Sequence, residues 1–298
     1  MNGICPITLK EDFIRRSHIF PKFMWKHLKN TGGCVFRNST KPTIELQNGL
    51  IMHLLGEKAE QMFSKRELWF EKNIFTPYVK NQFNNKLSYG VELYYFAISL
   101  LWRVLYINRD NVHLDLKSIV KDVLEDWRSF LNKEVEVPLL FQNIYIMPLD
   151  SNIMGVPHNN YDIDFYLLRE FDVNIMTALF SKDIAIYCKF PRFCIWGQLS
   201  RDDTNINYGI KISSKGGILK FKKFNIGNGI VRDYIINRIY DSAENAEKVS
   251  NELSDKVQDT IVKRIKMNIE NVRDSELGRL LLERGSQLNL TDNNNIVN

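Results

Sequence analysis

Apolar residues recur at helical spacing in three stretches of the chain. Residues 57–80 carry them three and four positions apart, with Pro77 near the end, which predicts an amphipathic helix. Residues 91–106 are apolar on most faces, which predicts a buried helix in the middle of a bundle. Residues 114–131 predict a further amphipathic helix, and we expect the whole of 84–133 to be helical.

Shorter runs typical of β-strands follow these helices. Residues 137–148 predict a strand, 151–160 a polar loop and 161–180 another helix. Beyond about residue 183, four short runs separated by turn residues predict an antiparallel sheet; they cover 184–190, 193–199, 208–212 and 218–221. The expected fold class is therefore α+β.

The N-terminal 55 residues predict short, irregular elements. A helix is expected over 19–28, with Pro21 in its first turn. Residues 35–37 and 43–47 predict two short strands that pair across the turn between them. We expect residues 1–83 to form a small basic module ahead of the helical region, 84–182.

The last part of the chain predicts a long amphipathic helix. Eight apolar positions between Ala246 and Val272 lie about 3.7 residues apart on average, close to the period of a straight helix. Such a helix either docks on its own domain or pairs with a second chain. It completes a β-rich region expected over 183–289, and 290–298 are expected to form a flexible tail.

Composition excludes several classes of protein. The chain has 298 residues, of which 44% are hydrophobic, enough for a large core. No run approaches the length of about 18 apolar residues that a membrane span needs. Four cysteines do not form a disulfide scaffold, and Cys188 and Cys194 are predicted to be buried thiols. With no apolar signal segment at the N-terminus, we expect a cytoplasmic location.

Positive charge is concentrated near the N-terminus. Residues 1–83 hold 13 Lys and Arg against 7 Asp and Glu, a balance of +6. Residues 84–298 hold 27 against 28, a balance of −1. This asymmetry indicates either an anionic partner for the first segment, most commonly nucleic acid, or a solvated basic surface without a partner.

The same segment carries the most specific motifs. They are Cys5-Pro6-Ile7-Thr8, then Ser17-His18-Ile19-Phe20-Pro21-Lys22-Phe23, then Leu54-Leu55-Gly56-Glu57-Lys58-Ala59-Glu60. Together they resemble a group of bacterial proteins related to the HNH (His-Me finger) nucleases, whose pattern is CxxC, SHIIPKF and LLCxxCE. Further matches, such as Phe190-Pro191-Arg192-Phe193, extend the resemblance over about residues 5–240. It implies an HNH-like N-terminal module and a place in a bacterial antiviral-defence or mobile-element system.

The sequence departs from this pattern at the zinc ligands. Of the four knuckle cysteines only Cys5 is present, since Thr8, Gly56 and Ala59 stand at the other positions. A tetrahedral structural site needs four ligands, so structural zinc is not expected and the knuckle is predicted to be a metal-free turn held by packing. The alternative is a site rebuilt from Cys34, His27 or His53.

The resemblance also implies catalytic roles for two residues. His18 would act as the general base that takes a proton from the water attacking a phosphodiester, with Mg²⁺ or Mn²⁺ stabilising the developing charge. Glu60 matches the acidic position of the last motif and would ligate the metal or orient His18. The alternative is a structural His18, which caps the helix entered at Pro21 or bonds a backbone carbonyl.

Basic residues cluster around His18, namely Arg15, Arg16, Lys22, Lys26 and Lys29. The three lysines recur on one face of the predicted helix and would line a phosphate backbone, while Trp25 either stacks on a base or packs inward. We therefore predict a DNA- or RNA-binding protein that acts as a metal-dependent nuclease if the site is active. The alternative is a non-catalytic interaction or regulatory subunit, with a protein partner or self-association through 246–272.

Overall fold

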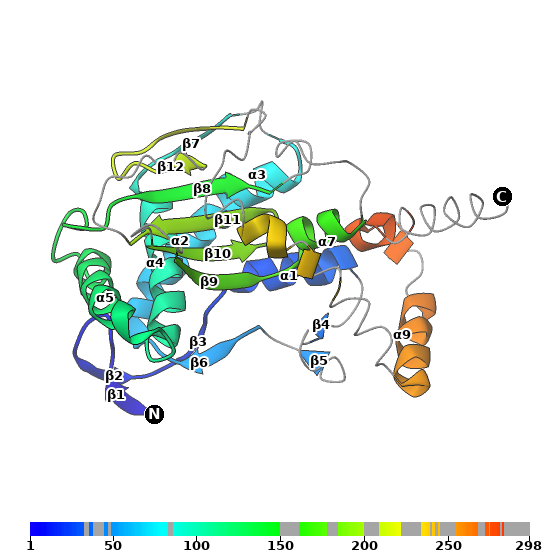
Figure 1. Ribbon diagram of the computed structural model, residues 1–298, viewed down its shortest axis with the longest axis horizontal. Helices are drawn as coiled ribbons and strands as arrows, with labels where there is room; N and C mark the ends of the chain where they lie inside the picture. The colour runs from blue at the N-terminus through cyan, green and yellow to red at the C-terminus, as the bar shows by residue number, and fades with distance from the viewer. Residues whose placement is uncertain are drawn as a thin grey trace.

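Figure 1 shows a computed structural model of the chain, in which helices combine with antiparallel sheets. The expected α+β class is confirmed. No helix within the described ranges is both long and apolar enough to cross a membrane. The structure describes residues 1–32, 36–37, 45–46, 49–82, 86–149, 161–177, 184–199, 209–221, 234–238, 240–241, 244, 254–267, 272–273, 275–280 and 282.

The largest sheet has five strands in the order β12-β8-β11-β10-β9, and every neighbouring pair is antiparallel. The predicted strands at 184–190 and 193–199 are confirmed as β10 and β11. The sheet also contains β8 and β9, so strands on both sides of residue 183 share it. The strands are β8 (Ile144–Pro148), β9 (Asp172–Thr177), β10 (Ile184–Phe190), β11 (Phe193–Gln198) and β12 (Ile210–Lys211).

Both faces of this sheet are covered, which explains why β10 and β11 are apolar almost throughout. On one face, alternate residues such as Ile146, Ile186 and Ile195 join the main hydrophobic core. On the other face, Tyr145 stacks on Trp196 with ring centroids 4.1 Å apart, in a second core that includes Tyr187. Cys188 and Cys194 are free, buried thiols, as predicted, and burial raises the pKa of both.

The helix α4 (Val91–Asn108) is buried from Leu93 to Leu105. It contacts strands β8, β10 and β11 as well as the helices α2 (Glu57–Phe70) and α5 (Lys117–Leu131), the latter preceded by the 3₁₀ turn η2 (Leu114–Leu116). The prediction that this helix lies in the middle of a bundle is therefore wrong on one side, where a sheet replaces helices. The helix predicted over 57–80 continues from α2 through the π-helical η1 (Glu71–Phe75) into α3 (Thr76–Val79).

The N-terminal segment contains three two-stranded pairs around one helix. β1 (Asn2–Ile4) pairs with β2 (Glu11–Phe13), and β3 (Arg16–His18) pairs with β6 (Ile51–His53). Between β3 and β6 lie α1 (Lys22–Gly32) and the pair of β4 (Phe36–Arg37) with β5 (Glu45–Leu46), which confirms the strand pair predicted there. α1 begins directly after Pro21 and runs past the predicted end at residue 28. Its Phe23 and Met24 join the same core as α4.

Three secondary-structure predictions are corrected. Residues 161–180 form α7 (Tyr161–Arg169) followed by β9, because β9 gains the edge of the large sheet beside β10. Residues 86–89 form a strand, β7 (Lys86–Tyr89), which pairs with β13 (Gly217–Lys220), so 84–133 is not helical throughout. The strand predicted at 137–148 is confined to β8, because Asp126 accepts hydrogen bonds from the backbone of 139–141 and holds them as a loop.

The described part of the long C-terminal helix is α9 (Asp255–Met267). Of the region predicted as one helix, 246–272, residues 246–253 and 268–271 lie outside the described residues. So do the predicted loop, 151–160, and the predicted tail, 290–298. Residues on α9 such as Val262 and Met267 are exposed.

Candidate nucleic-acid interface

The short strand β3 orients the residues of the SHIF motif. Successive side chains of a strand point to opposite faces, and here Arg16 is exposed, Ser17 is buried and His18 is partly exposed. Ser17 Oγ accepts a hydrogen bond from the Leu55 backbone at 3.0 Å, which joins this motif to the LLGE motif. Arg16 and His18 therefore share one face of the β3–β6 ribbon, with His53 opposite Arg16.

A buried arginine holds the backbone of this strand from behind. Arg103 of α4 is only 2% exposed, and its Nη1 donates a hydrogen bond of 2.7 Å to the His18 carbonyl. The same nitrogen lies 2.8 Å from Glu67 Oε1, and the guanidinium lies over the ring of Phe63. Because a buried cation is costly without an anion, the Glu67 carboxylate makes this position of Arg103 tenable. His18 is thus fixed through its backbone, while its imidazole stays accessible.

The imidazole of His18 lies in a cationic environment. Its pKa is lowered from the ordinary 6.5, first by partial burial and then by the positive charges of Lys22, Arg103 and Arg16. His18 is therefore neutral at pH 7, the form that can accept a proton or a hydrogen bond. The hydrogen bond from Arg103 goes to the His18 carbonyl, so it does not test the structural alternative, in which His18 caps the helix or bonds a backbone carbonyl.

Glu60 lies on α2, seven residues before Glu67 and so on a similar face of that helix. It is partly buried, and its Oε1 has no hydrogen-bond partner among the described residues. Among the described contacts none joins Glu60 to His18. The acidic residue that the structure links to the His18 strand is Glu67, through Arg103.

The basic residues around His18 are all exposed, and Arg15 has an ion pair within the chain. Arg15 pairs with Glu57, with 2.6 Å between Nε and Oε2, and this contact lowers the pKa of Glu57. Much of the Arg15 charge is therefore already matched within the chain. The other four side chains are exposed on β3 and along one face of α1; they are Arg16, Lys22, Lys26 and Lys29.

Of the two alternatives for Trp25, stacking on a base or packing inward, the structure shows inward packing. Its ring stacks on Phe171 with centroids 4.1 Å apart and packs against the main core. A base cannot stack on the face that Phe171 occupies. The exposed face of α1 therefore presents cations, without an aromatic platform from Trp25.

The residues at the knuckle positions do not fit a zinc ion. Cys5 is a free thiol with no exposed surface, in a turn closed by hydrogen bonds from Leu9 N to Cys5 O (2.8 Å) and from Cys5 N to Lys10 O (2.9 Å). At Gly56 a side chain would collide with Asp12, so the third knuckle position has no room for a ligand. Within the described ranges, no group of three or more His, Cys, Asp or Glu could hold a metal ion.

Of the three residues considered for a rebuilt zinc site, His27 and His53 belong to no described group with Cys5 that could hold a metal ion. His53 Nδ1 is 3.4 Å from the Ile14 carbonyl, and His27 lies on α1 beside Glu276. Cys34 falls outside the described residues. The donor set of the described chain therefore does not fit zinc, nor does it assemble a cage for Mg²⁺ or Mn²⁺.

Comparisons of the chain with protein-family models, with curated proteins and with solved structures find no match. The likeness to HNH-related proteins therefore rests on the sequence motifs alone.

Sequence reasoning missed Arg103 and Glu67 as members of this site. One signal was available, since Arg103 is a lone cation within the apolar stretch 91–106. A charge at such a position is buried when the helix is buried, and a buried cation needs an acceptor. What the sequence does not specify is that α2 and β3 supply those acceptors.

Proposed function

We propose that the protein binds nucleic acid through the exposed face formed by β3 and α1. One observation carries the proposal: the exposed Arg16 and the partly exposed His18 share one face of the β3–β6 ribbon, and the exposed Lys22 follows at the start of α1. A neutral imidazole next to several cations suits a phosphate, which accepts hydrogen bonds and gains from each nearby positive charge.

The geometry of α1 extends this surface. Lys22, Lys26 and Lys29 follow one another at four- and three-residue spacing, so they line one side of the helix over two turns. The first turn of α1, directly after the His18 strand, contains no acidic residue. Its unpaired N–H groups add to the positive potential near His18. Phosphates of a single backbone would therefore contact the start of α1 and then its lysine face.

The test is an anisotropy titration with DNA and RNA oligonucleotides of the same sequence. Arg16→Ala combined with Lys22→Ala should weaken binding about tenfold or more at low salt, because two phosphate contacts are lost. The matched control is Lys263→Ala with Lys266→Ala, which removes two exposed lysines from α9. If both variants weaken binding equally, the affinity depends only on the net charge of the protein. That result would contradict a site at β3 and α1.

A second candidate function is cleavage of the bound phosphodiester, favoured by the neutral state of His18. In this reaction His18 would accept the proton of the attacking water and Arg16 and Lys22 would orient the phosphate, while the bond from phosphorus to the leaving oxygen breaks and that oxygen takes a proton from solvent. The resemblance implies Mg²⁺ or Mn²⁺ as cofactor, and among the described residues no group of three or more His, Cys, Asp or Glu gathers to hold such an ion. No step is therefore assigned to a metal.

The cleavage assay compares wild type, His18→Ala and His113→Ala, with Mg²⁺, with Mn²⁺ and with EDTA. His113 is an exposed histidine before η2, so it controls for loss of an imidazole. Cleavage that is lost only in His18→Ala would support the general-base role. Equal cleavage by His18→Ala and wild type, or none by either, would exclude it and leave a binding protein. Absence of binding as well would favour the non-catalytic interaction subunit, active within the proposed bacterial defence or mobile-element system.

A further inference from the structure

The β1–β2 ribbon presents an apolar face to solvent directly ahead of β3. Phe13 of β2 lies opposite Asn2 of β1, and Ile4 lies diagonally across from Phe13 on the same face. Phe13 keeps 51% of its surface exposed and Ile4 keeps 66%. The other face of the ribbon is turned inward, since a Cβ at Gly3 would lie 3.2 Å from the buried Ile14 side chain. Phe13 is therefore an aromatic ring held at the surface by a regular strand.

A neighbouring cation fixes the surroundings of this ring. The guanidinium carbon of Arg15 lies 5.2 Å from the centroid of the Phe13 ring. Arg15 is held there by Glu57 at the start of α2, with 2.6 Å between Nε and Oε2, and its backbone N–H donates to the Leu55 carbonyl at 2.8 Å. The guanidinium covers part of the ring, and because half of the Phe13 surface stays exposed, a flat apolar group still reaches the rest.

The cations of the proposed interface begin three residues beyond Phe13. Arg16 opens β3 and Lys22 opens α1, and both side chains are exposed. In Figure 1 the β1–β2 ribbon lies at one edge of the molecule, and β3 leads from it toward α1. Three residues of extended chain span at most about 10 Å. A strand of about three nucleotides covers that length at a spacing of about 3.4 Å, so one strand reaches both Phe13 and Arg16.

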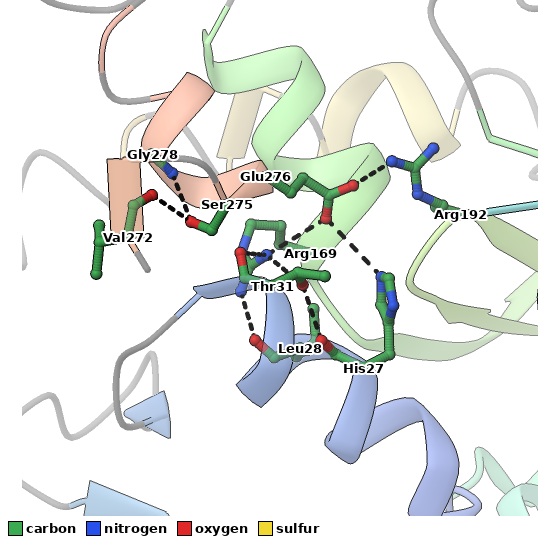
Figure 2. Close-up of polar contacts among 9 residues, drawn as sticks. All are labelled: His27, Leu28, Thr31, Arg169, Arg192, Val272, Ser275, Glu276 and Gly278. Atoms are coloured by element: carbon green, nitrogen blue, oxygen red, sulfur yellow. Dashed lines mark hydrogen bonds and ion pairs between the residues drawn. The ribbon is translucent and has the colours of Figure 1, made fainter. Parts of the chain in front are cut away.

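At the other end of α1 the described side chains are engaged with one another. Figure 2 shows Arg169 of α7 at the last turn of α1, where it donates to the carbonyls of Leu28 (3.0 Å) and Thr31 (3.3 Å). Arg169 Nη1 also lies 3.3 Å from the buried carboxylate of Glu276, which forms a second ion pair with Arg192. A strand that follows the lysine face of α1 therefore meets an exposed aromatic ring beyond the start of the helix, on β2.

Charge along β2 favours a base at Phe13 and phosphates beyond it. The exposed acid Glu11 lies two residues before Phe13 on the same face, and Arg15 lies two residues after it. A phosphate is repelled at the first position and attracted at the second, whereas an uncharged base fits between them. Bases of a duplex are stacked inside the helix, while unpaired bases are free to stack on an aromatic side chain. The ring therefore suits a single strand.

We infer that Phe13 is a stacking platform for an unpaired base, so that the interface at β3 and α1 takes single-stranded nucleic acid. The inference rests on the nucleic-acid binding proposed there and adds the class of substrate. The ring is continuous with the cations of that interface, which is why a nucleic acid is chosen as its occupant. A second copy of the chain is the other occupant of an exposed apolar face, and the test separates the two.

The test uses the full chain and two probes with the same phosphates, a thymidine octamer and an octamer of abasic residues, in anisotropy titrations. Phe13→Ala should lose about tenfold in affinity for the thymidine octamer, the usual size of one base–aromatic stack, and should bind the abasic octamer as wild type does. The matched control is Tyr240→Ala, which removes an exposed ring elsewhere and should change neither affinity. Equal losses for the two octamers in Phe13→Ala, or no loss for either, would overturn the inference.

Two further variants separate stacking from an ordinary apolar contact and cover the case in which Phe13→Ala does not fold. Phe13→Leu keeps an apolar side chain without a flat ring and should lose affinity for the thymidine octamer, whereas Phe13→Trp keeps the platform and should bind at least as tightly as wild type. The slope of log K against log salt should be unchanged in both, because a ring releases no counterions. Wild-type affinity in Phe13→Leu would overturn the inference, as would a shallower slope.

Failure of the platform is distinguishable from failure of the interface. If Arg16→Ala with Lys22→Ala weakens binding of both octamers while Phe13→Ala weakens neither, the interface stands and the platform is wrong. If wild type binds neither octamer, both proposals are wrong. Sedimentation of wild type and Phe13→Ala tests the second occupant: self-association that is lost in Phe13→Ala, with unchanged affinity for the thymidine octamer, would assign the face to a second copy and overturn the inference.

Discussion

At the scale of single residues, Arg103 determines how His18 is held. It connects α4 to the His18 carbonyl and to Glu67 through one nitrogen, Nη1. Its Nε also donates to the Ser99 carbonyl at 3.2 Å, within its own helix. Three elements of the N-terminal half therefore depend on this one buried cation.

Replacement of Arg103 should be strongly destabilising. Arg103→Met keeps much of the side-chain volume but leaves Glu67 without its cation and the His18 carbonyl without its donor. We expect the free energy of unfolding to fall by about 3 kcal/mol, as for other broken buried ion pairs. Urea denaturation measures the change. The control is Arg109→Met, which removes a more exposed pair with Asp110 and should cost less than about 1 kcal/mol. Similar values for the two variants would contradict the role given to Arg103.

His27 makes the stability of the fold sensitive to pH. Burial lowers its pKa from 6.5 to about 4; Arg192 and Arg169 act in the same direction and Glu276 opposes them. Because the folded pKa is below the unfolded one, the unfolded chain binds more protons between these values. The stabilisation is complete above pH 6.5 and is lost as pH falls toward 4.

The expected loss from this group is about 2 kcal/mol between pH 7 and pH 5. The measurement is the free energy of unfolding at both pH values for wild type, His27→Gln and the exposed-site control His113→Gln. The change in the free energy of unfolding between pH 7 and pH 5 should be smaller by that amount in His27→Gln, and it should be unchanged in His113→Gln. An unchanged difference in His27→Gln would contradict the account.

At the scale of elements, the end of α1 is held by a neighbouring helix. Arg169 of α7 supplies hydrogen bonds to the carbonyls of Leu28 and Thr31, and Gly32 provides the space for its guanidinium. A cation at this end of α1 also matches the negative end of the helix dipole.

Gly32→Ala therefore tests whether the contact of Gly32 with Arg169 outweighs the higher helix propensity of alanine. Alanine is about 1 kcal/mol better than glycine inside a helix, so propensity alone predicts a rise in Tm. We expect a fall instead, because the new Cβ displaces Arg169 from Leu28 and Glu276. Asn30→Ala, at an exposed position of the same turn, is the control and should leave Tm unchanged or slightly higher. A higher Tm for Gly32→Ala would show that displacing Arg169 does not destabilise the fold.

Elements with a long periodic pattern were predictable from the sequence, whereas short strands were less so. α2, α4 and α5 carry several turns of apolar periodicity, and β10 and β11 are buried on both faces. The sequence predicts helix at β9, because Asp172–Thr177 follows α7 without a strong helix breaker. Pairing with β10 stabilises β9 as a strand. A local sequence pattern does not show which separate segments will pair.

At the scale of the whole molecule, one core joins the basic N-terminal segment to the rest. The main hydrophobic cluster includes residues from Cys5 to Phe221, so the turn between β1 and β2, the helices α1 and α4, and the sheet pack together. The local part of the candidate site was predictable, since Arg16, His18 and Lys22 are close in sequence. Arg103, Glu67 and Glu276 come from distant segments, and only the packing of the helices brings them to α1 and β3.

The exposed face of β3 and α1 is proposed to bind a phosphate backbone, and the salt dependence of binding is the direct test of such contacts. The measurement is the slope of log K against log salt for an oligonucleotide. It is made on wild type, on the triple variant Lys22→Ala, Lys26→Ala and Lys29→Ala, and on a control with Lys256, Lys263 and Lys266 of α9 replaced by Ala.

Each lysine that contacts a phosphate contributes about one unit to that slope. We expect the slope to become shallower by up to about three units in the α1 variant and to stay at the wild-type value in the α9 control. Binding without salt dependence, or an equal change of slope in the two triple variants, would contradict it.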